Sequence, residues 1–578
     1  MTMATRVRIV SVLFLVGSIA LVIRLFYWQA IRASELSDQA RLQYQSEEKV
    51  LAKRGSILAS DGTWLATNID SYLVFISKPD LKEKSRTVAN KLAAILVEKK
   101  DGESAGDYQK DLLSEASRIE GLIENTKSVW IPIKHKVELN IKRNIEALGI
   151  AGVGFDTEPV RFYPEASSSA QVLGFVGKDN AGDDKGYFGL EGYYDLTLSG
   201  KPGYINRESN AAGIPILFGN SKEIDPVEGV DLTTHIDKTV QMYAEKELEK
   251  GIQDYGAKGG TVIIMDPNDG SVLAMASYPY YDPGKYWEFT SDKFKNPAIS
   301  DGFEPGSIMK PLVVAAGLDA GAIKVDTICD ICDGPVKVDK YEIETWNHEY
   351  HPNSSMTDII VNSDNVGMTF IGRKLGADKL YDYFNKFGFG ETTGVDLQGE
   401  VSPQIRKKGT WNIVDLATAT FGQGVAVTPI QMARAICAVA NGGYLVKPQV
   451  VEKIGKGDWA NEVKQEKGER VISQKTAEEV RDMMIQAIER GESKWAAPKG
   501  FKIAGKTGTA QIPVAGHYDD KKTIASFIGF APANKPRFAM LVTLTEPSSS
   551  QWGSETAAPL WFNIARDIFP YLGIQPEN

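Results

Sequence analysis

The heptapeptide EPGSIMK, which places Ser307 and Lys310 three residues apart, limits what this chain can fold into more than any other stretch. It leads into the apolar run 311–318, which predicts a helix with Pro305 and Gly306 as its entry turn. Residues three apart on a helix lie on one face. The two side chains are therefore predicted to lie within reach of a shared proton.

This spacing has a chemical meaning only under certain conditions. A serine hydroxyl is a weak nucleophile until a base takes its proton. A lysine acts as that base only when burial or a neighbouring cation lowers its pKa. The same pattern also occurs on ordinary helix surfaces, where the serine caps the helix and the lysine is solvated. The pattern therefore requires a second cation elsewhere in the chain.

Composition narrows the class of protein. A length of 578 residues predicts two or three domains, and 43% hydrophobic with 24% charged residues is typical of a folded globular protein. The net charge of -10 and the lack of a Lys/Arg-rich block argue against a nucleic-acid partner. Three cysteines exclude a disulfide framework.

The N-terminal region predicts a membrane anchor. The run 9–23 is apolar and uncharged, and continuing to Trp28 gives roughly 20 residues, enough to cross a bilayer. A cleaved signal peptide is less favoured, because no clean small-x-small site follows the run. Arginines on both sides, at Arg6, Arg8 and Arg24, leave the orientation undetermined.

Two modules are predicted beyond this run. From Lys49 to about Pro226, short strands and polar helices contain no obvious nucleophile and base, which predicts a structural or interaction module. Its marked local features are Arg54-Gly55, Arg161-Phe162-Tyr163-Pro164 and Gly189-Leu190-Glu191. The stretch 200–226, rich in Gly, Pro, Asn and Ser, marks a domain boundary.

The second module has β-rich runs at both ends and helices between them. Runs 260–265 and 272–276, joined by a Pro-Asn-Asp-Gly turn, predict a hairpin. The later β-rich runs are 501–509, 523–530 and 538–545, followed by a helix over 558–572. The predicted fold class is α+β, with one sheet built from both ends of the module.

Two further motifs give the serine–lysine pair its meaning. Ser363-Asp364-Asn365 lies in a loop between two predicted helices, and Lys506-Thr507-Gly508-Thr509 lies on a predicted strand. The three motifs occur in order on helix, loop and strand. Each falls on the type of element that its role requires, which makes the combination specific.

On these residues the chain resembles the penicillin-binding proteins, the active-site serine D,D-transpeptidases whose relatives include the serine β-lactamases. Residues 421–424, 428–431 and 441–443 resemble class B, monofunctional members, and FGQGVAVTPIQMA is closer to the cell-division type than to the elongation type. Leu58-Ala59-Ser60 departs from the Asp-Arg pair that the family more often has before Asp61-Gly62.

The resemblance implies an architecture and a location. It implies an α+β chain with a transmembrane helix, a mixed pedestal domain, and a transpeptidase domain similar to serine β-lactamases, with an antiparallel sheet flanked by helices. The expected bounds are 1–6 for a cytoplasmic tail, 7–28 for the anchor, 29–226 for a pedestal domain of the dimerisation type, and 227–578 for the transpeptidase domain. Since the family's reaction takes place outside the cytoplasmic membrane, the N-terminus is expected inside and both domains on the periplasmic side.

The resemblance also implies roles. Ser307 is expected to attack the carbonyl of the penultimate D-Ala of a stem peptide, with Lys310 as general base and Lys506 as the second cation. Ser363 is expected to relay protons to the leaving amine, and Asn365 to bind the donor backbone. In the substrate-binding segment Thr507-Gly508-Thr509, the threonine hydroxyls are expected to hold the donor carboxylate. The N–H groups of Ser307 and Thr509 are expected to form the oxyanion hole.

The expected partners follow from that chemistry. They are donor and acceptor stem peptides, β-lactam antibiotics, and, docked on the pedestal, a polytopic membrane glycosyltransferase with other division proteins; no nucleic acid, metal or organic cofactor is expected. Alternatives are an elongation-type transpeptidase, a β-lactamase, a penicillin-sensing receptor and a non-catalytic scaffold. Length, anchor and first module argue against the β-lactamase, the short stretch before the anchor against the receptor, and the intact motifs against the scaffold.

The cysteines and histidines are secondary features. In an oxidising space Cys329 and Cys332 are expected either to form a short local disulfide or to remain an unpaired surface pair. Cys437 is predicted to be buried in a helix. His348 and His351 lie near Trp346, but further zinc ligands are missing, which favours a plain cleft loop.

Overall fold

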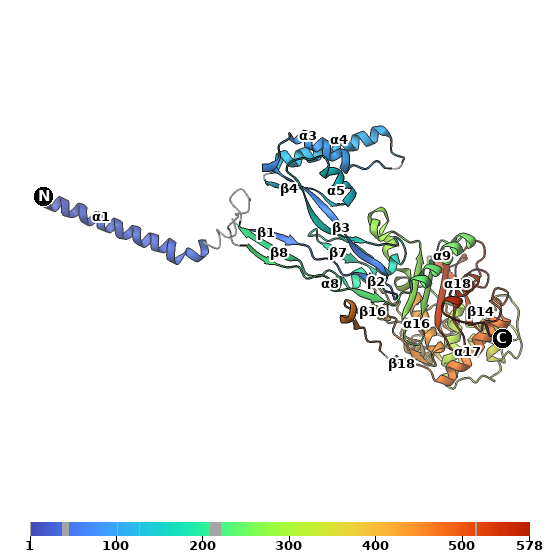
Figure 1. Cartoon of the computed structure of the whole chain (residues 1–578). Helices are drawn as coiled ribbons and strands as arrows, with labels where there is room; N and C mark the ends of the chain where they lie inside the picture. The colour runs from blue at the N-terminus through green and yellow to red at the C-terminus, as the bar shows by residue number, and fades with distance from the viewer. Residues whose placement is uncertain are drawn as a thin grey trace. The chain divides into compact units, whose positions relative to one another are not determined.

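The computed structural model describes residues 2–36, 45–100, 102–126, 128–208, 221–466, 468–514 and 517–577. The chain divides into two units. Figure 1 shows the whole chain, coloured by residue number. Unit 1 comprises Met1–Lys53, Asn68–Val160 and Gly200–Gly229; unit 2 comprises Arg54–Thr67, Arg161–Ser199 and Val230–Asn578. Two segments of the expected pedestal region, 54–67 and 161–199, therefore belong to unit 2.

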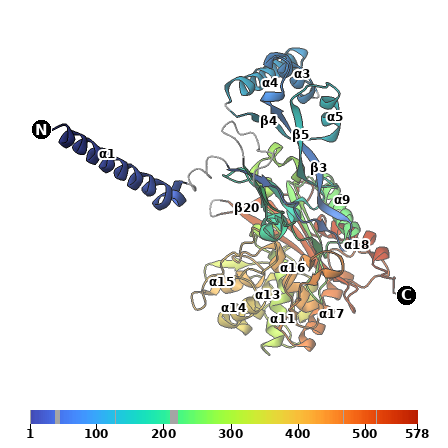
Figure 2. The same ribbon diagram turned by 60° about the vertical axis from the view of Figure 1, so that its left-hand side comes forward.

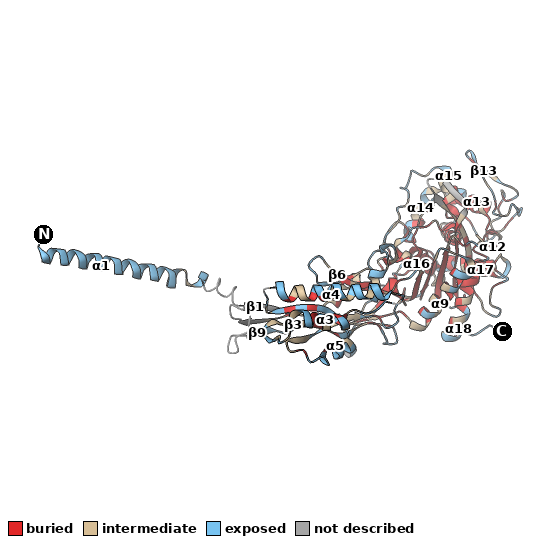
Figure 3. Cartoon of the chain, turned by 90° about the horizontal axis from the view of Figure 1, so that it is seen from above, coloured by how far each residue is buried: buried red, intermediate tan, exposed pale blue. Residues whose placement is uncertain are grey.

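The N-terminal apolar run forms helix α1, Met3–Phe26, which continues as a π-helical turn over Tyr27–Ile31. Together they make a helix of 29 residues that is long and apolar enough to cross a membrane. None of its apolar window is buried, and Figure 3 colours α1 as exposed along its length. This one N-terminal apolar helix is consistent with a single-pass anchor.

Besides α1, the described residues of unit 1 form a three-stranded sheet, a second set of paired strands and three main helices. The sheet consists of β1 Gln45–Val50, β8 Gly203–Glu208 and β9 Ser221–Ile224. In the second set, β3 Trp64–Ser77 pairs with β4 Trp130–Val137 and with β5 Val153–Phe162. The helices are α3 Ser85–Leu96, α4 Ala105–Asn125 and α5 Leu139–Glu146, which Figure 2 shows gathered around β4 and β5.

The core of unit 1 follows from helix periodicity. Val88, Leu92 and Leu96 of α3 recur at four-residue spacing and are buried, and they pack with Val74 and Ile76 of β3. This spacing makes α3 an amphipathic helix with one buried face. The next helix, α4, begins at Ala105, where Ser104 caps it by accepting from the N–H of Asp107.

The central sheet of unit 2 has five antiparallel strands in the order β12-β11-β21-β20-β19. Their bounds are β11 Gly259–Met265, β12 Val272–Tyr278, β19 Ala504–Val514, β20 His517–Ala531 and β21 Phe538–Thr545. The predicted hairpin is confirmed as β11 and β12, and the C-terminal runs are confirmed as three strands. The first of these begins at Ala504, three residues later than predicted.

Alternating residues of β11 point to opposite faces of this sheet. Val262 and Ile264 pack in a cluster with helices α9 and α18, whereas Ile263 and Met265 pack in a second cluster with α11, α13, α16 and α17. The helix bounds are α9 Lys238–Tyr255, α11 Lys310–Asp319, α13 Asn365–Leu375, α16 Pro429–Ala440, α17 Gln474–Arg490 and α18 Ala557–Tyr571. Unit 2 is therefore a sheet between two helical layers, and its α+β class is confirmed.

Cysteine pairing is also settled. Cys329 and Cys332 form a disulfide, so the first of the two alternatives is correct. Both are buried, and the backbone N–H of Cys329 donates to the carbonyl of Ser354, one residue before the capping serine of α12, Met356–Val361. Cys437 is buried in α16, as predicted.

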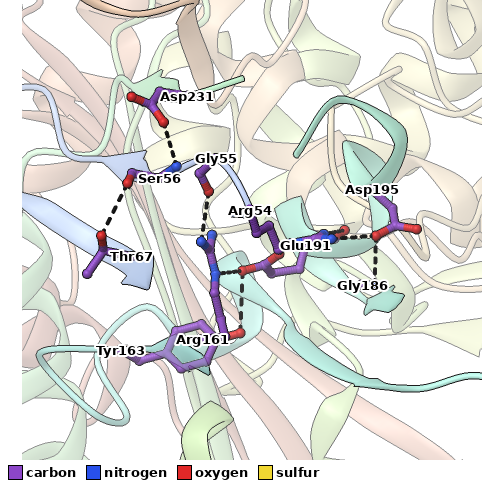
Figure 4. A network of polar contacts seen from close by, with 10 residues as sticks. All are labelled: Arg54, Gly55, Ser56, Thr67, Arg161, Tyr163, Gly186, Glu191, Asp195 and Asp231. Atoms are coloured by element: carbon purple, nitrogen blue, oxygen red, sulfur yellow. Dashed lines mark hydrogen bonds and ion pairs between the residues drawn. The ribbon is translucent and has the colours of Figure 1, made fainter. Parts of the chain in front are cut away.

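The marked local features of the first module meet in one buried ion-pair network of unit 2 (Figure 4). Glu191 is fully buried and accepts from two arginines: its Oε2 lies 2.6 Å from Nε of Arg54, and its Oε1 lies 2.6 Å from Nε of Arg161. Arg54 also donates through Nη1 to Oδ1 of Asp195 at 2.8 Å. Each arginine is the first residue of its unit 2 segment. The network therefore joins three stretches that are distant in sequence.

Candidate active site

Ser307 lies in a tight 3-10 turn, Gly306–Met309, immediately before α11. Gly306 has a φ of 56°, and a Cβ there would lie 2.9 Å from the carbonyl oxygen of Thr509 on β19. Only glycine allows this backbone conformation together with so close an approach. The helix predicted from the apolar run begins only at Lys310, so Ser307, which follows the predicted entry turn, precedes the α-helix.

Lys310 is buried at the start of α11, and its Nζ makes three polar contacts. It donates to the carbonyl oxygen of Ser363 at 2.6 Å, to Oγ of Ser363 at 3.2 Å and to Oδ1 of Asn365 at 2.8 Å. Burial lowers the pKa of Lys310 well below its ordinary value, and the charge of Lys506 lowers it further, although Asp364 and Glu492 act in the opposite direction. Lys310 is thus disposed toward the neutral form of a base.

The Ser363-Asp364-Asn365 loop is shaped by a strained residue and a helix cap. Ser363 has a φ of 54°, in the left-handed region that non-glycine residues seldom adopt. Asp364 caps α13 by accepting from the N–H groups of Val366 and Gly367. This geometry turns both the carbonyl and the hydroxyl of Ser363 toward Lys310.

Lys506 lies on β19 and is 3% exposed. Its Nζ donates to the carbonyl oxygen and to Oγ1 of Thr507, each at 3.1 Å. Burial lowers the pKa of Lys506 to about 8, against a smaller opposing effect of Glu492. Further along the strand, Oγ1 of Thr509 accepts from the N–H of Gly553 at 3.0 Å. The strand thus presents a buried cation and two hydroxyl-bearing residues.

These motifs meet at one cavity of about 360 Å³. Six of the predicted site residues line it: Ser307, Ser363, Asn365, Thr507, Gly508 and Thr509. The other two, Lys310 and Lys506, are buried and contact residues of the lining. The structure thus brings all eight together, from a turn, a helix, a loop and a strand.

The cavity also includes residues that sequence reasoning did not assign to it. Trp346 and Trp552 meet edge to face, with ring centroids 5.1 Å apart, and both line the cavity with Gln423 and Glu492. Trp346 belongs to the segment interpreted as a cleft loop, and Gln423 belongs to the motif 421–424, which was not assigned to the site. No local pattern indicated Glu492 or Trp552. Within the described ranges, no group of three or more His, Cys, Asp or Glu side chains is arranged to hold a metal ion.

Comparison with known proteins agrees with this geometry. Residues 260–569 match the family model described as the penicillin-binding protein transpeptidase domain, and residues 49–234 match the penicillin-binding protein dimerisation domain.

Relatives extend this match to most of the chain. Stage V sporulation protein D of Bacillus subtilis is 32% identical over 560 residues, covering 96% of this chain and 84% of its own length. The probable peptidoglycan D,D-transpeptidase PenA of Neisseria gonorrhoeae is 30% identical over 581 residues, covering 100% and 94%. Penicillin-binding protein 3 of Mycobacterium tuberculosis, solved in complex with aztreonam, shares the fold with a TM-score of 0.68 at 24% identity, over 92% and 98% of the two chains. With the serine, the two lysines and the strand motif around one cavity, this chain belongs to the class B penicillin-binding proteins, the peptidoglycan D,D-transpeptidases.

Proposed function

We propose that this chain cross-links peptidoglycan stem peptides through an acyl-enzyme on Ser307, in the septal cell wall, from an anchor in the cytoplasmic membrane. The observation that carries the proposal is a pair of buried lysines beside the cavity that Ser307 and Ser363 line. Lys310 has a strongly lowered pKa and contacts Ser363, and Lys506 lies on the strand that borders the same cavity. A base and a fixed cation beside one serine are what acyl transfer requires.

In the acylation step, neutral Lys310 takes the proton of Ser307 while Oγ attacks the carbonyl of the penultimate D-Ala. The N–H groups of Ser307 and Thr509 stabilise the developing oxyanion. In comparable sites, each such donor lowers the activation free energy by about 3 kcal/mol. Ser363 passes the proton to the leaving amine of the terminal D-Ala. Its contact with Nζ of Lys310, at 3.2 Å, supports this route.

Substrate binding is assigned to the strand and to the loop. Lys506 and the hydroxyls of Thr507 and Thr509 hold the terminal carboxylate of the donor, and Asn365 binds the donor backbone. In the second step, the amino group of another stem peptide attacks the acyl-enzyme and forms the cross-link. Penicillins and other β-lactams acylate the same serine; the aztreonam complex of the Mycobacterium relative supports this assignment.

The cellular role is proposed from the class of relatives. One curated relative, at 30% identity over 602 residues, is the peptidoglycan D,D-transpeptidase FtsI homolog of Mesostigma viride, which supports a division role. Since stem peptides lie outside the cytoplasmic membrane, the N-terminus is inside and the residues that follow the anchor are outside. The pedestal region docks a polytopic glycosyltransferase and other division proteins.

The chemical proposal is tested by intact-protein mass spectrometry. The detergent-solubilised full chain is treated with a labelled penicillin, alongside Ser307→Ala and the control Ser300→Ala. A stable adduct on the wild type and on Ser300→Ala, but none on Ser307→Ala, is the expected result. Rapid loss of the adduct with hydrolysed drug would instead identify a β-lactamase. No adduct on any of the three proteins would identify a scaffold.

The septal role needs a separate experiment in cells. A fluorescent fusion of the full chain, expressed in its own host, is expected to gather at the division site. An even distribution along the side wall would favour the elongation-type alternative. The chemical proposal would stand in either case.

A further inference from the structure

One acidic side chain, that of Glu492, lies in the wall of the catalytic cavity. The other lining residues carry hydroxyl, amide or aromatic groups or are glycines: Gly306, Ser307, Trp346, Ser363, Asn365, Phe421, Gln423, Thr507, Gly508, Thr509, Gln511, Thr523, Gln551 and Trp552. Among the described residues that line the cavity, Glu492 is therefore the only acidic or basic one. The charge of Glu492 therefore acts on any charged ligand that enters the cavity.

The position of Glu492 is fixed by its neighbours in sequence. Arg490, the last residue of α17, donates through Nη2 to Oδ1 of Asp358 on α12 at 2.8 Å. Gly491 lies against the end of α12, because a Cβ there would be 3.1 Å from the carbonyl oxygen of Val361. Both contacts hold Glu492 next to the loop that carries the proposed proton relay.

The carboxylate is half-buried and makes no ion pair or hydrogen bond with another described residue. It nevertheless acts on both buried lysines. Burial lowers the pKa of Lys310 and of Lys506, and Glu492 opposes that effect at each of them. The carboxylate therefore lies in the electric field of the reacting groups and remains available to a ligand.

We propose that Glu492 binds the ammonium group of the acyl acceptor and so selects amines over neutral nucleophiles. This inference rests on the proposed transpeptidase function. An amine arrives protonated from water, and an unpaired, half-buried carboxylate attracts it. The carboxylate of the donor has by then departed with the terminal D-Ala, so it no longer repels Glu492 or competes for the acceptor.

In the transfer of the acyl group to the acceptor, the bound ammonium group releases one proton to solvent, and its nitrogen forms a C–N bond with the acyl carbon. The bond from that carbon to Oγ of Ser307 breaks, and the second proton of the amine reaches this Oγ through Ser363. Methanol reacts by the same route to give a methyl ester, but it is neutral when it enters. Glu492 therefore distinguishes the two nucleophiles by charge alone.

A competition experiment tests this inference on the full chain in detergent. An acyl-enzyme is formed from a thioester analogue of the donor in the presence of Nα-acetyl-lysine amide and methanol, and the amide, methyl ester and free acid are quantified. In Glu492→Gln the ratio of amide to ester is expected to fall roughly three- to tenfold. The amine concentration for half-saturation is expected to rise by a similar factor, because recruitment is weakened.

Two controls separate this effect from a loss of structure. Glu489→Gln removes an exposed carboxylate from α17 and is expected to keep the wild-type ratio of amide to ester, and Glu492→Asp is expected to restore part of it. In the wild type, added salt is expected to lower the ratio, a test that needs no variant.

The outcomes are distinguishable. An acyl-enzyme whose ratio of amide to ester is the same in the wild type and in Glu492→Gln, or falls equally in Glu489→Gln, would overturn the inference alone. So would a wild-type ratio that salt does not change. Failure of the wild type to form any acyl-enzyme on Ser307 would overturn the proposed function, and this inference with it.

Discussion

Unit 2 contains two buried clusters of charged side chains that differ in their charge balance. At the catalytic cavity, Lys310 and Lys506 are both buried, and neither forms an ion pair with a described carboxylate. In the network of Figure 4, two arginines share the buried Glu191, and Asp195 pairs with one of them. One cluster holds cations without a direct ion-pair partner among the described residues, and the other holds two charges of each sign.

The difference shows that a buried charged side chain becomes reactive when it has no ion-pair partner and holds segments together when it has one. An uncompensated cation in a buried site shifts toward its neutral form, which makes Lys310 a base and limits Lys506 to a pKa of about 8. In the other cluster, burial would raise the pKa of Glu191, but Arg161 and Arg54 outweigh it and the pKa is lowered. The balanced cluster keeps its charges and holds distant segments together.

The largest expected effect is on the rate of acylation, after a substitution in the lysine cluster of the catalytic cavity. Lys310→Met removes the base but keeps an unbranched side chain of similar length. Penicillin acylation is expected to fall by about a hundredfold to ten-thousandfold. The thermal midpoint is expected not to fall, because an apolar group replaces a buried, unpaired cation. Stopped-flow acylation and a thermal melt measure the two quantities. A lower midpoint would mean that the lysine stabilises the fold.

The second effect is on stability at the balanced cluster. Glu191→Gln leaves Arg54 and Arg161 buried without their shared carboxylate, so the free energy of unfolding is expected to fall by about 3–5 kcal/mol. Urea denaturation measures this change, and penicillin titration counts the sites that still react. The matched control is Glu165→Gln, which breaks an exposed pair with Lys238 and is expected to cost at most about 1 kcal/mol. Equal costs in the two variants would remove the distinction between the clusters.

The third effect is on pH dependence, where the two clusters are expected to respond in different pH ranges. The pKa of Lys506 is about 8 in the folded chain against an ordinary 10.5, so acylation is expected to decline as pH rises through about 8. Because the unfolded chain binds this proton more tightly, the contribution of Lys506 to stability rises between those two values. Rate profiles of the wild type and of Lys506→Arg test this, because the guanidinium stays charged and the decline should be absent.

In acid, the protonation of Glu191 is expected to determine how the stability of its cluster changes with pH. Its pKa is lowered from 4.5 in the folded chain, so its contribution to stability is present above 4.5 and lost as pH falls through the folded value. Thermal melts in acid are expected to show a smaller loss in Glu191→Gln than in the wild type. Parallel losses in both proteins would contradict the assignment.

Local sequence patterns predicted the strands and the motif helices, because alternation and apolar runs indicate elements. The residues that meet at the cavity were predicted from the resemblance to the penicillin-binding proteins. Those patterns do not indicate which residues distant in sequence come into contact. Nothing near Glu492 indicates that the end of α17 turns it into the cavity. Likewise, Arg54 and Glu191 are 137 residues apart, so the assignment of segments 54–67 and 161–199 to unit 2 depends on contacts that only the fold creates.

The smallest expected effect is on stability, after a substitution of Arg54 that keeps the positive charge and changes the hydrogen-bond geometry. Arg54 donates through Nε to Glu191 and through Nη1 to Asp195, while Nη2 donates to the carbonyl oxygen of Glu191 at 2.9 Å. A lysine keeps the charge but presents one ammonium group, which cannot span these acceptors. Arg54→Lys is therefore expected to lower the free energy of unfolding by about 1–3 kcal/mol, less than Glu191→Gln. Urea denaturation ranks the two variants. A cost equal to that of Glu191→Gln would show that the fork of hydrogen bonds, rather than charge balance, stabilises this cluster.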